Sequence, residues 1–184
     1  MTDAPAALTA ADVVAFWRAA GPKRWFKKEE GFDDDIRQRF LKLHEAATAG
    51  KLTDWEARAE GALALLILLD QFPRNMFRGQ ARSFVTDPLA RAIASRAILN
   101  GFDGAFPDMS GFFYLPFMHS EELADQERAI ALYRARNDAD NLKWAQKHAD
   151  VIRRFGRFPH RNAVLGRVST PEEQEFLNSG GFAG

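Results

Sequence analysis

Apolar residues recur every three or four positions through most of the sequence, which is the spacing of a helix with one buried face. No segment shows the strict alternation of apolar and polar residues that a half-buried strand would need. The apolar stripes and their flanking residues predict helices over residues 10–20, 33–49, about 56–72, 88–100, 121–136, about 139–155 and 171–178.

Several of these segments begin at residues that commonly cap helices. Thr9 precedes the first one, and Thr170-Pro171-Glu172-Glu173 combines a cap, a proline at the first helical position and a capping-box glutamate. Thr53 with Glu56 shows the same capping-box spacing, Asp87-Pro88 also predicts a helix start, and Ser120 is expected to cap the helix from residue 121. Asp33 and Asp138 or Asp140 are further expected caps.

One segment is apolar on nearly every side. Residues 62–69 contain only alanine, leucine and isoleucine, so this helix is expected at the centre of the core, with Pro73 limiting it. Leu89, Ile93 and Leu99 predict a second closely packed helix. Residues 112–118 are aromatic and apolar but include Pro116, and are therefore expected to form a buried connector rather than a central strand.

These patterns predict an all-α fold. We expect residues 1–184 to form a single compact domain of packed helical hairpins, with right-angle or superhelical packing, because the chain length fits one domain and no linker is visible. The sequence lacks the tetratricopeptide consensus, such as its Trp-x-x-Leu-Gly pattern. Residues 1–8 and 179–184 are expected to fray.

Composition narrows the range of functions. Lys plus Arg and Asp plus Glu both number 25, which argues against a dedicated nucleic-acid-binding protein. The absence of cysteine excludes disulfides and thiolate metal sites. The longest apolar run is far shorter than the roughly 18 residues of a membrane span, and no basic leader precedes an apolar segment. We therefore expect a cytoplasmic protein that binds neither nucleic acid nor membrane; the oligomeric state stays open.

Arginine is concentrated near the end of the chain. Arg153, Arg154, Arg157, Arg161 and Arg167 lie between residues 151 and 171, a stretch without any acidic residue. The planar guanidinium suits carboxylate and phosphate, so this cluster indicates an anion-binding pocket, to which Arg74 and Arg78 are added as candidates from the middle of the chain. The alternative is that these arginines pair with acids elsewhere and have a purely structural role.

Asp70 and the histidines are the remaining candidates for chemistry. Asp70 follows the apolar helix and is expected to be buried, so it needs a partner, either Arg74 or one of the arginines of residues 157–167. His119 and His160 are candidate acid–base residues because histidine titrates near neutral pH. His148, flanked by apolar residues, is expected to be packed and hydrogen-bonded. The histidines lack the spacing of a helical zinc site, so neither metal nor cofactor is expected.

Five segments resemble one known family. They are LDQFPRNMFR (69–78), YLPFMHSE (114–121), RFGRFPHRN (154–162), LGR (165–167) and STPEE (169–173). Together they are similar to domain-of-unknown-function family 924, which occurs in bacteria and eukaryotes, and the similarity extends over nearly the whole chain. The resemblance implies an all-helical, tetratricopeptide-like fold and carries no established activity, cofactor or partner.

The sequence thus leaves three functional hypotheses. The leading one is binding of a small anionic ligand or an acidic peptide. The alternatives are a hydrolase that uses a histidine as acid–base with arginine as charge stabiliser, and a helical protein-interaction scaffold. The candidate ligand-binding residues are Asp70, Arg74, Asn75, Arg78, Arg157, Arg161, Asn162 and Arg167.

Overall fold

The computed structural model describes residues 8–182, and in that range all regular structure is helical. The α-helices are α1 (Ala10–Ala20), α2 (Pro22–Trp25), α3 (Glu30–Thr48), α4 (Ala59–Leu66), α5 (Phe72–Met76), α6 (Asp87–Leu99), α7 (Leu115–Met118), α8 (Leu123–Ala135), α9 (Ala139–Phe155) and α10 (Pro171–Asn178). The expected all-α fold is confirmed. Short helical turns connect these elements: η1 (Thr53–Ala57), η2 (Ile67–Gln71), η3 (Ala81–Phe84), η4 (Phe102–Gly104), η5 (Ser110–Phe113) and η6 (Pro159–Arg161).

Three of the expected caps form. Thr9 and Thr170 make complete capping boxes with Asp12 and Glu173, and the Asp138 side chain accepts the backbone N–H of Asn141. Helix α9 ends at Gly156, whose φ of 68° places it in the left-handed region that glycine adopts without strain. These ends were predictable because each depends on residues within one turn of the chain.

Other expected starts are wrong. Thr53 begins the short turn η1, and α4 follows only at Ala59. Helix α3 begins at Glu30, ahead of Asp33, and α8 begins at Leu123, although the Ser120 hydroxyl does accept the N–H of Glu122. Leu99, expected in the core, has 83% of its surface exposed because it lies at the end of α6.

The core is built around one buried helix that bulges in its middle. Residues 61–73 of α4, η2 and the start of α5 are all buried. The helix does not stop at Pro73 as expected. It continues to Met76 through η2, a π-helical turn in which the N–H of Phe72 reaches the carbonyl of Ile67.

The π-helical turn leaves backbone carbonyls that other elements satisfy. Pro73 has no N–H, so the carbonyl of Leu69 cannot receive its helical bond and instead accepts the Thr86 hydroxyl at 2.6 Å. The carbonyl of Leu68 lies 2.9 Å from His44 Nδ1, and that of Asp70 accepts Arg74 Nη1 at 2.6 Å. The bulge is therefore supported by side chains from α3, α5 and the start of α6.

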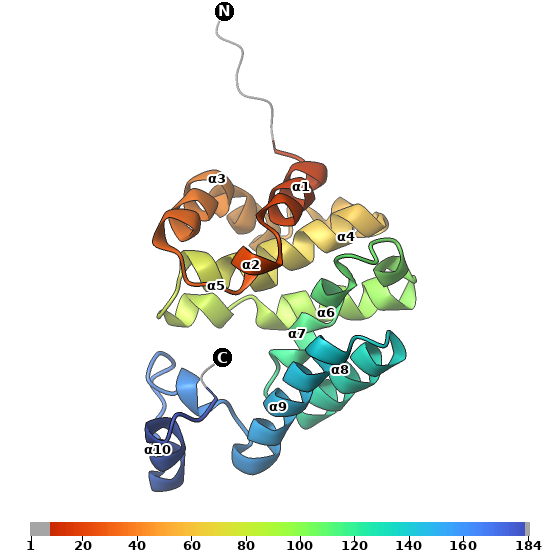
Figure 1. Cartoon of the computed structure of the whole chain (residues 1–184). Coiled ribbons are helices and arrows are strands. Elements are labelled where there is room, and N and C mark those ends of the chain that lie inside the picture. The colour runs from red at the N-terminus through yellow and green to blue at the C-terminus, as the bar shows by residue number, and fades with distance from the viewer. Residues whose placement is uncertain (1–7, 183–184) are drawn as a thin grey trace, which may run out of the picture.

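The other helices pack around this central one in two groups (Figure 1). Helices α1, α3 and α6 contact α4, η2 or α5, whereas α8 and α9 form a hairpin that α7 connects to the first group. The segment with η6 and α10 packs through a small cluster of Val151, Ile152 and Phe158. This arrangement fits the expected helical hairpins within one domain.

The expected fraying concerns mainly residues that lie outside the described range, namely 1–7, 183 and 184. Among the residues that the structure describes, Phe182 is half-buried, and the centroid of its ring lies 4.4 Å from that of His148. No helix in residues 8–182 combines the length and the apolar character that crossing a membrane requires.

Replacing a leucine of the central helix should cost far more stability than replacing one at the surface. Leu66 is 1% exposed, so Leu66→Ala is expected to lower the free energy of unfolding by about 2–5 kcal/mol through lost contacts and an unfilled cavity. The matched control Leu99→Ala should change it by less than about 0.5 kcal/mol. Urea unfolding of both variants measures this; equal losses would contradict the burial described above.

Candidate functional site

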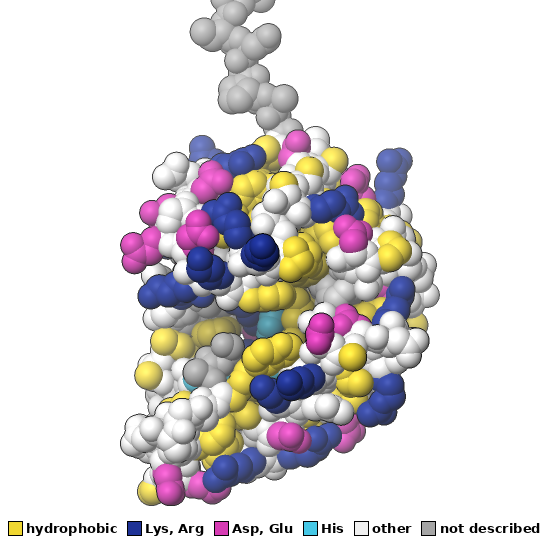
Figure 2. All heavy atoms as spheres, in the orientation of Figure 1, with side chains coloured by type: hydrophobic (Ala, Val, Ile, Leu, Met, Phe, Trp, Pro, Cys, Tyr) yellow, Lys and Arg dark blue, Asp and Glu magenta, His cyan; other side chains and the backbone are white. Residues whose placement is uncertain are grey.

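A cleft of about 320 Å³ opens between the two helical groups. Its walls carry two kinds of side chain. Trp25, Phe26 and Phe84 are aromatic, and the polar residues are Gln71, Arg74, Asn75, Arg78, Ser83, His119, His148, His160 and Arg161. Figure 2 shows a hollow at the middle of the molecule with a histidine visible inside it. Three of the four histidines of the protein meet at this cleft.

Asp70 lies behind the cleft wall, in the π-helical turn, and is 1% exposed. Its carboxylate accepts His119 Nδ1 at 2.8 and 3.1 Å and the Gln71 amide at 2.5 Å, and Arg74 Nη1 lies 3.4 Å away. Burial alone would raise the pKa of Asp70, but Arg74, His119 and Gln71 outweigh burial and hold the pKa below its usual value. Asp70 is therefore ionised and acts only as an acceptor.

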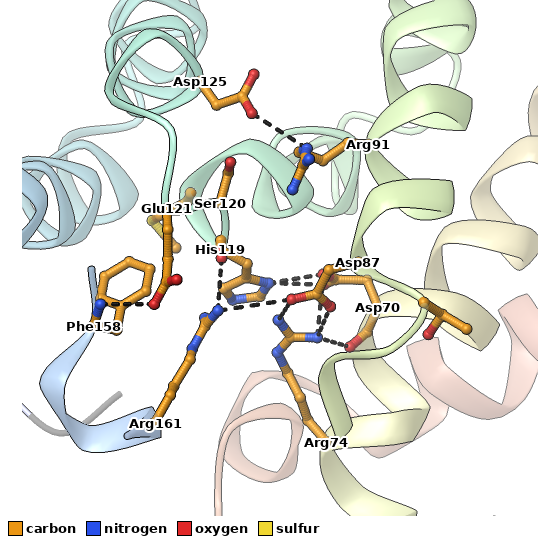
Figure 3. A network of polar contacts seen from close by, with 12 residues as sticks. Asp70, Arg74, Asp87, Arg91, His119, Ser120, Glu121, Asp125, Phe158 and Arg161 are labelled. Carbon is orange, nitrogen blue, oxygen red and sulfur yellow. Dashed lines mark hydrogen bonds and ion pairs between the residues drawn. The ribbon is translucent and has the colours of Figure 1, made fainter. Parts of the chain in front are cut away.

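His119 ends the short helix α7 and is oriented by Asp70 (Figure 3). Because the ionised carboxylate can only accept, Nδ1 of His119 donates and the lone pair lies on Nε2. Burial lowers the pKa of His119, and Arg74 lowers it further, while Asp70 opposes both. The imidazole is thus neutral near pH 7, with its unprotonated nitrogen available to the cleft.

Two arginines and a second aspartate complete this buried network (Figure 3). Arg74 donates to both oxygens of Asp87 at 3.0 Å, and Asp87 is 5% exposed. Arg161 donates to the backbone carbonyl of His119 at 3.0 Å and lies 3.8 Å from Asp87. Burial, followed by repulsion from Arg74, lowers the pKa of Arg161 to about 10, so its guanidinium remains charged at pH 7.

The other two histidines of the cleft have no carboxylate partner among residues 8–182. Nδ1 of His148 donates to the carbonyl of Trp144 at 2.8 Å, which agrees with the expectation of a packed, hydrogen-bonded histidine. Nδ1 of His160 is buried and without a partner among the described residues. Burial is the largest cause that lowers the pKa of His148 to about 3 and that of His160 to about 4. Both rings are therefore neutral at pH 7.

The structure brings together part of the set that the sequence indicated. Of the candidates, Arg74, Asn75, Arg78, His119, His160 and Arg161 line the cleft, and Asp70 supports it from behind. Arg157, Asn162 and Arg167 do not line it: Arg157 binds Glu173, and Arg167 binds Glu121 and the side chain of Asn162. These three residues hold the segment that carries Arg161.

The acid-free stretch of sequence is not free of acids in space. Arg153 pairs with Asp150 and Arg154 with Glu172, in addition to the pairs just described; outside the stretch, Arg78 pairs with Asp33. The partners come from just outside the stretch or from distant parts of the chain, so local composition overstates the positive charge. Arg161 is less completely paired than the others, because its nearest carboxylate among residues 8–182 is 3.8 Å away and is already bound at both oxygens by Arg74.

Sequence reasoning missed several residues of the site. The partner of Asp70 is His119, 49 positions later, in addition to the expected Arg74. Asp87 was interpreted as a helix cap, but its carboxylate binds Arg74. Trp25, Phe26 and Phe84 gave no signal, since isolated aromatic residues are common in any core. The available hint was the burial expected of Asp70, which predicted a partner for its carboxylate but did not indicate His119.

The comparisons with known proteins agree with this architecture. Residues 13–181 match the family model described as bacterial protein of unknown function, DUF924. The chain belongs to the DUF924 family. A solved structure of a protein of unknown function from Agrobacterium tumefaciens is similar to this DUF924 chain, with 49% identity and a TM-score of 0.90, over 92% of this chain and 97% of the other. No curated protein matches the sequence.

The site of this DUF924 protein does not have the geometry of a metal centre. Within residues 8–182, no group of three or more His, Cys, Asp or Glu side chains is arranged to hold a metal ion. Two of the three histidines of the cleft are fixed through Nδ1, to Asp70 and to the Trp144 carbonyl. The chemistry available from the described residues is hydrogen bonding, charge stabilisation and proton transfer.

The buried histidines make stability depend on pH. His148 is neutral in the folded protein down to about pH 3, whereas an unfolded histidine takes up a proton below about pH 6.5. Its contribution to stability is complete above pH 6.5 and is lost progressively as the pH falls towards 3. Between pH 7 and pH 5 the wild type should therefore lose about 2 kcal/mol more than His148→Gln. Urea unfolding at both pH values measures this, and equal losses would contradict a buried neutral His148.

Proposed function

We propose that the cleft binds a small anionic ligand and that Arg161 is its main anchor. The observation that carries the proposal is that this guanidinium is buried and incompletely hydrogen-bonded. The side chain of Arg161 is 8% exposed, and its Nε is buried without a hydrogen-bond partner among residues 8–182. Leaving a donor of a buried charged group unpaired is costly, and Arg161 lines the cleft, so a ligand acceptor that approaches the exposed part of its guanidinium improves its hydrogen bonding.

The placement of charge supports an anion rather than a neutral ligand. Asp70 and Asp87 equal Arg74 and Arg161 in total charge, but both carboxylates lie against Arg74, at 3.4 and 3.0 Å, whereas Arg161 lies 3.8 Å from Asp87. The charge of Arg161 is therefore less closely compensated than that of Arg74, and a negative group of a ligand would complete its pairing. The distance of 3.8 Å between Arg161 and Asp87 exceeds that of a direct charge-assisted hydrogen bond, which is about 2.7–2.9 Å.

The dimensions of the cleft favour a small molecule. A volume of about 320 Å³ lies at the lower end of the range for ligand pockets, roughly 300–1,000 Å³. Arg161 and His148 are both buried, so an acidic side chain of a folded partner would have to enter the cleft to reach them. The aromatic residues Trp25 and Phe84 offer flat walls for the uncharged part of such a ligand.

The test compares two arginines of the same segment. Acetate, citrate and inorganic phosphate serve as probes, and a ligand at 100 times its dissociation constant adds about 2.7 kcal/mol to stability. At least one of them should raise the melting temperature of the wild type. Arg161→Gln, which removes the positive charge and keeps a polar side chain, should abolish that increase. The control Arg154→Gln removes an exposed arginine paired with Glu172 and should retain the increase.

A second measurement tests binding without relying on protein stability. Calorimetric titration of the same probes gives the affinity directly and does not depend on changes in the stability of the variants. If no probe binds the wild type, or if Arg161→Gln binds as tightly as Arg154→Gln, the cleft is not an anion site centred on Arg161.

A further inference from the structure

The Asp70–His119 pair has the geometry of a carboxylate that orients a neutral histidine base, rather than that of an ion pair. Asp70 fixes Nδ1 of His119 through two contacts, of 2.8 and 3.1 Å, and thereby fixes both the ring plane and the tautomer. Nε2 makes no hydrogen bond to any described residue, and His119 lines the cleft. A histidine that served structure alone would have no need of an unprotonated nitrogen facing open space.

Charged groups from four elements surround this imidazole. Asp70 comes from η2, Arg74 from α5, Asp87 from α6 and Arg161 from η6, and the neutral His148 of α9 lies 6.3 Å away, ring centroid to centroid. Burial, followed by repulsion from Arg74, lowers the pKa of His119 and keeps it unprotonated at rest, while Asp70 and Asp87 favour the imidazolium. The site can therefore accept a proton for the duration of a reaction step without holding it in the ground state.

The base and the anion anchor are connected through the same residue. Arg161 Nη1 donates to the backbone carbonyl of His119 at 3.0 Å, so the guanidinium lies beside the residue whose side chain faces the cleft (Figure 3). The guanidinium also stacks on Phe84 and Phe158, at 4.6 and 4.4 Å from their ring centroids. A cation held this rigidly next to a base suits negative charge that develops during a reaction.

We propose that this cleft hydrolyses a carboxylic ester, with His119 as general base and Arg161 as the stabiliser of the oxyanion. The inference rests on the proposed anion binding, because the carboxylate product would remain on Arg161. A carboxylic ester is chosen over a phosphate monoester because Arg161 is the one cleft arginine of the described chain without a close carboxylate partner. One such cation matches a singly charged oxyanion better than a dianion.

The steps balance without an oxidant or a further reactant. A water molecule attacks the acyl carbon while Nε2 of His119 takes one of its protons, and the electrons of the C=O bond move onto the oxygen beside Arg161. The tetrahedral intermediate then re-forms the C=O bond and breaks the bond to the alcohol oxygen. The imidazolium returns its proton to that oxygen, so water and ester give carboxylic acid and alcohol, and the acid then loses its proton to solvent and remains as the carboxylate beside Arg161.

The other histidines are unsuited to this role. Within the part of the chain that the structure describes, neither His148 nor His160 has a carboxylate partner to stabilise an imidazolium, and their low pKa values make both rings weak proton acceptors. In this mechanism His119 is the catalytic base, and Asp70, which does not touch the substrate, is a positioning residue.

The experiment measures release of p-nitrophenol from p-nitrophenyl acetate by the full chain. The wild type should exceed the buffer rate, and His119→Gln should lower kcat/KM by about 100-fold or more, the usual contribution of a general base. The exposed control Arg154→Gln should keep the wild-type rate. Acetate binding by His119→Gln should persist, since Arg161 is intact; this separates the loss of the base from the loss of the anion site.

Asp70→Asn supplies a readout that a purely structural role would not change. Asp70 raises the pKa of His119, so without its charge the acidic limb of the kcat/KM profile should move to lower pH as the rate falls. A wild type that binds acetate without releasing p-nitrophenol above the buffer rate, or His119→Gln at the wild-type rate, would overturn the hydrolysis and leave the anion site standing. A wild type that binds no probe anion would remove the basis of both proposals.

Discussion

The buried carboxylate of Asp70 is the constraint on which the cleft depends. A charge that is 1% exposed is tolerated only when it is paired and hydrogen-bonded. Its partners come from three places: Gln71 beside it, Arg74 one turn later and His119 at the end of α7. The hydrogen bonds that satisfy Asp70 therefore join the central helix to α7, which leads into the second helical group.

The π-helical turn that contains Asp70 follows from Pro73. Pro73 removes an N–H and its ring would collide with the carbonyl four residues earlier, so the helix widens at residues 67–71 instead of breaking. The widened turn frees the carbonyl of Leu69 for Thr86 and that of Asp70 for Arg74. Turns of this kind occur often at functional sites, and here the distortion places a carboxylate against a histidine of the cleft.

The sequence predicted those features whose causes are local. The capping boxes at Thr9 and Thr170 and the apolar helix through residues 62–69 depend on neighbouring positions, and they were recognised. The burial of Asp70 and its pairing with Arg74 followed in the same way, four residues apart. Its pairing with His119 did not, because spacing along the chain carries no information on a contact between distant helices.

Charge along the sequence was the least reliable guide to the site. Arg157 and Arg167 belong to the run that indicated an anion pocket, but Glu173 and Glu121 neutralise them outside the cleft. Arg161, from the same run, remains the incompletely paired cation. Only the three-dimensional positions of the acids distinguish these arginines.

The central claim is that His119 is neutral because of its burial and of Arg74, while Asp70 holds the single ring proton on Nδ1 and leaves Nε2 free in the cleft. Nitrogen-15 NMR of the imidazole ring at pH 7 tests it directly, with His119→Gln used to assign the signals. The account predicts one protonated nitrogen, Nδ1, and one unprotonated nitrogen, Nε2, whose signal moves on addition of acetate. A ring protonated on Nε2 alone, or an imidazolium at pH 7, would contradict it.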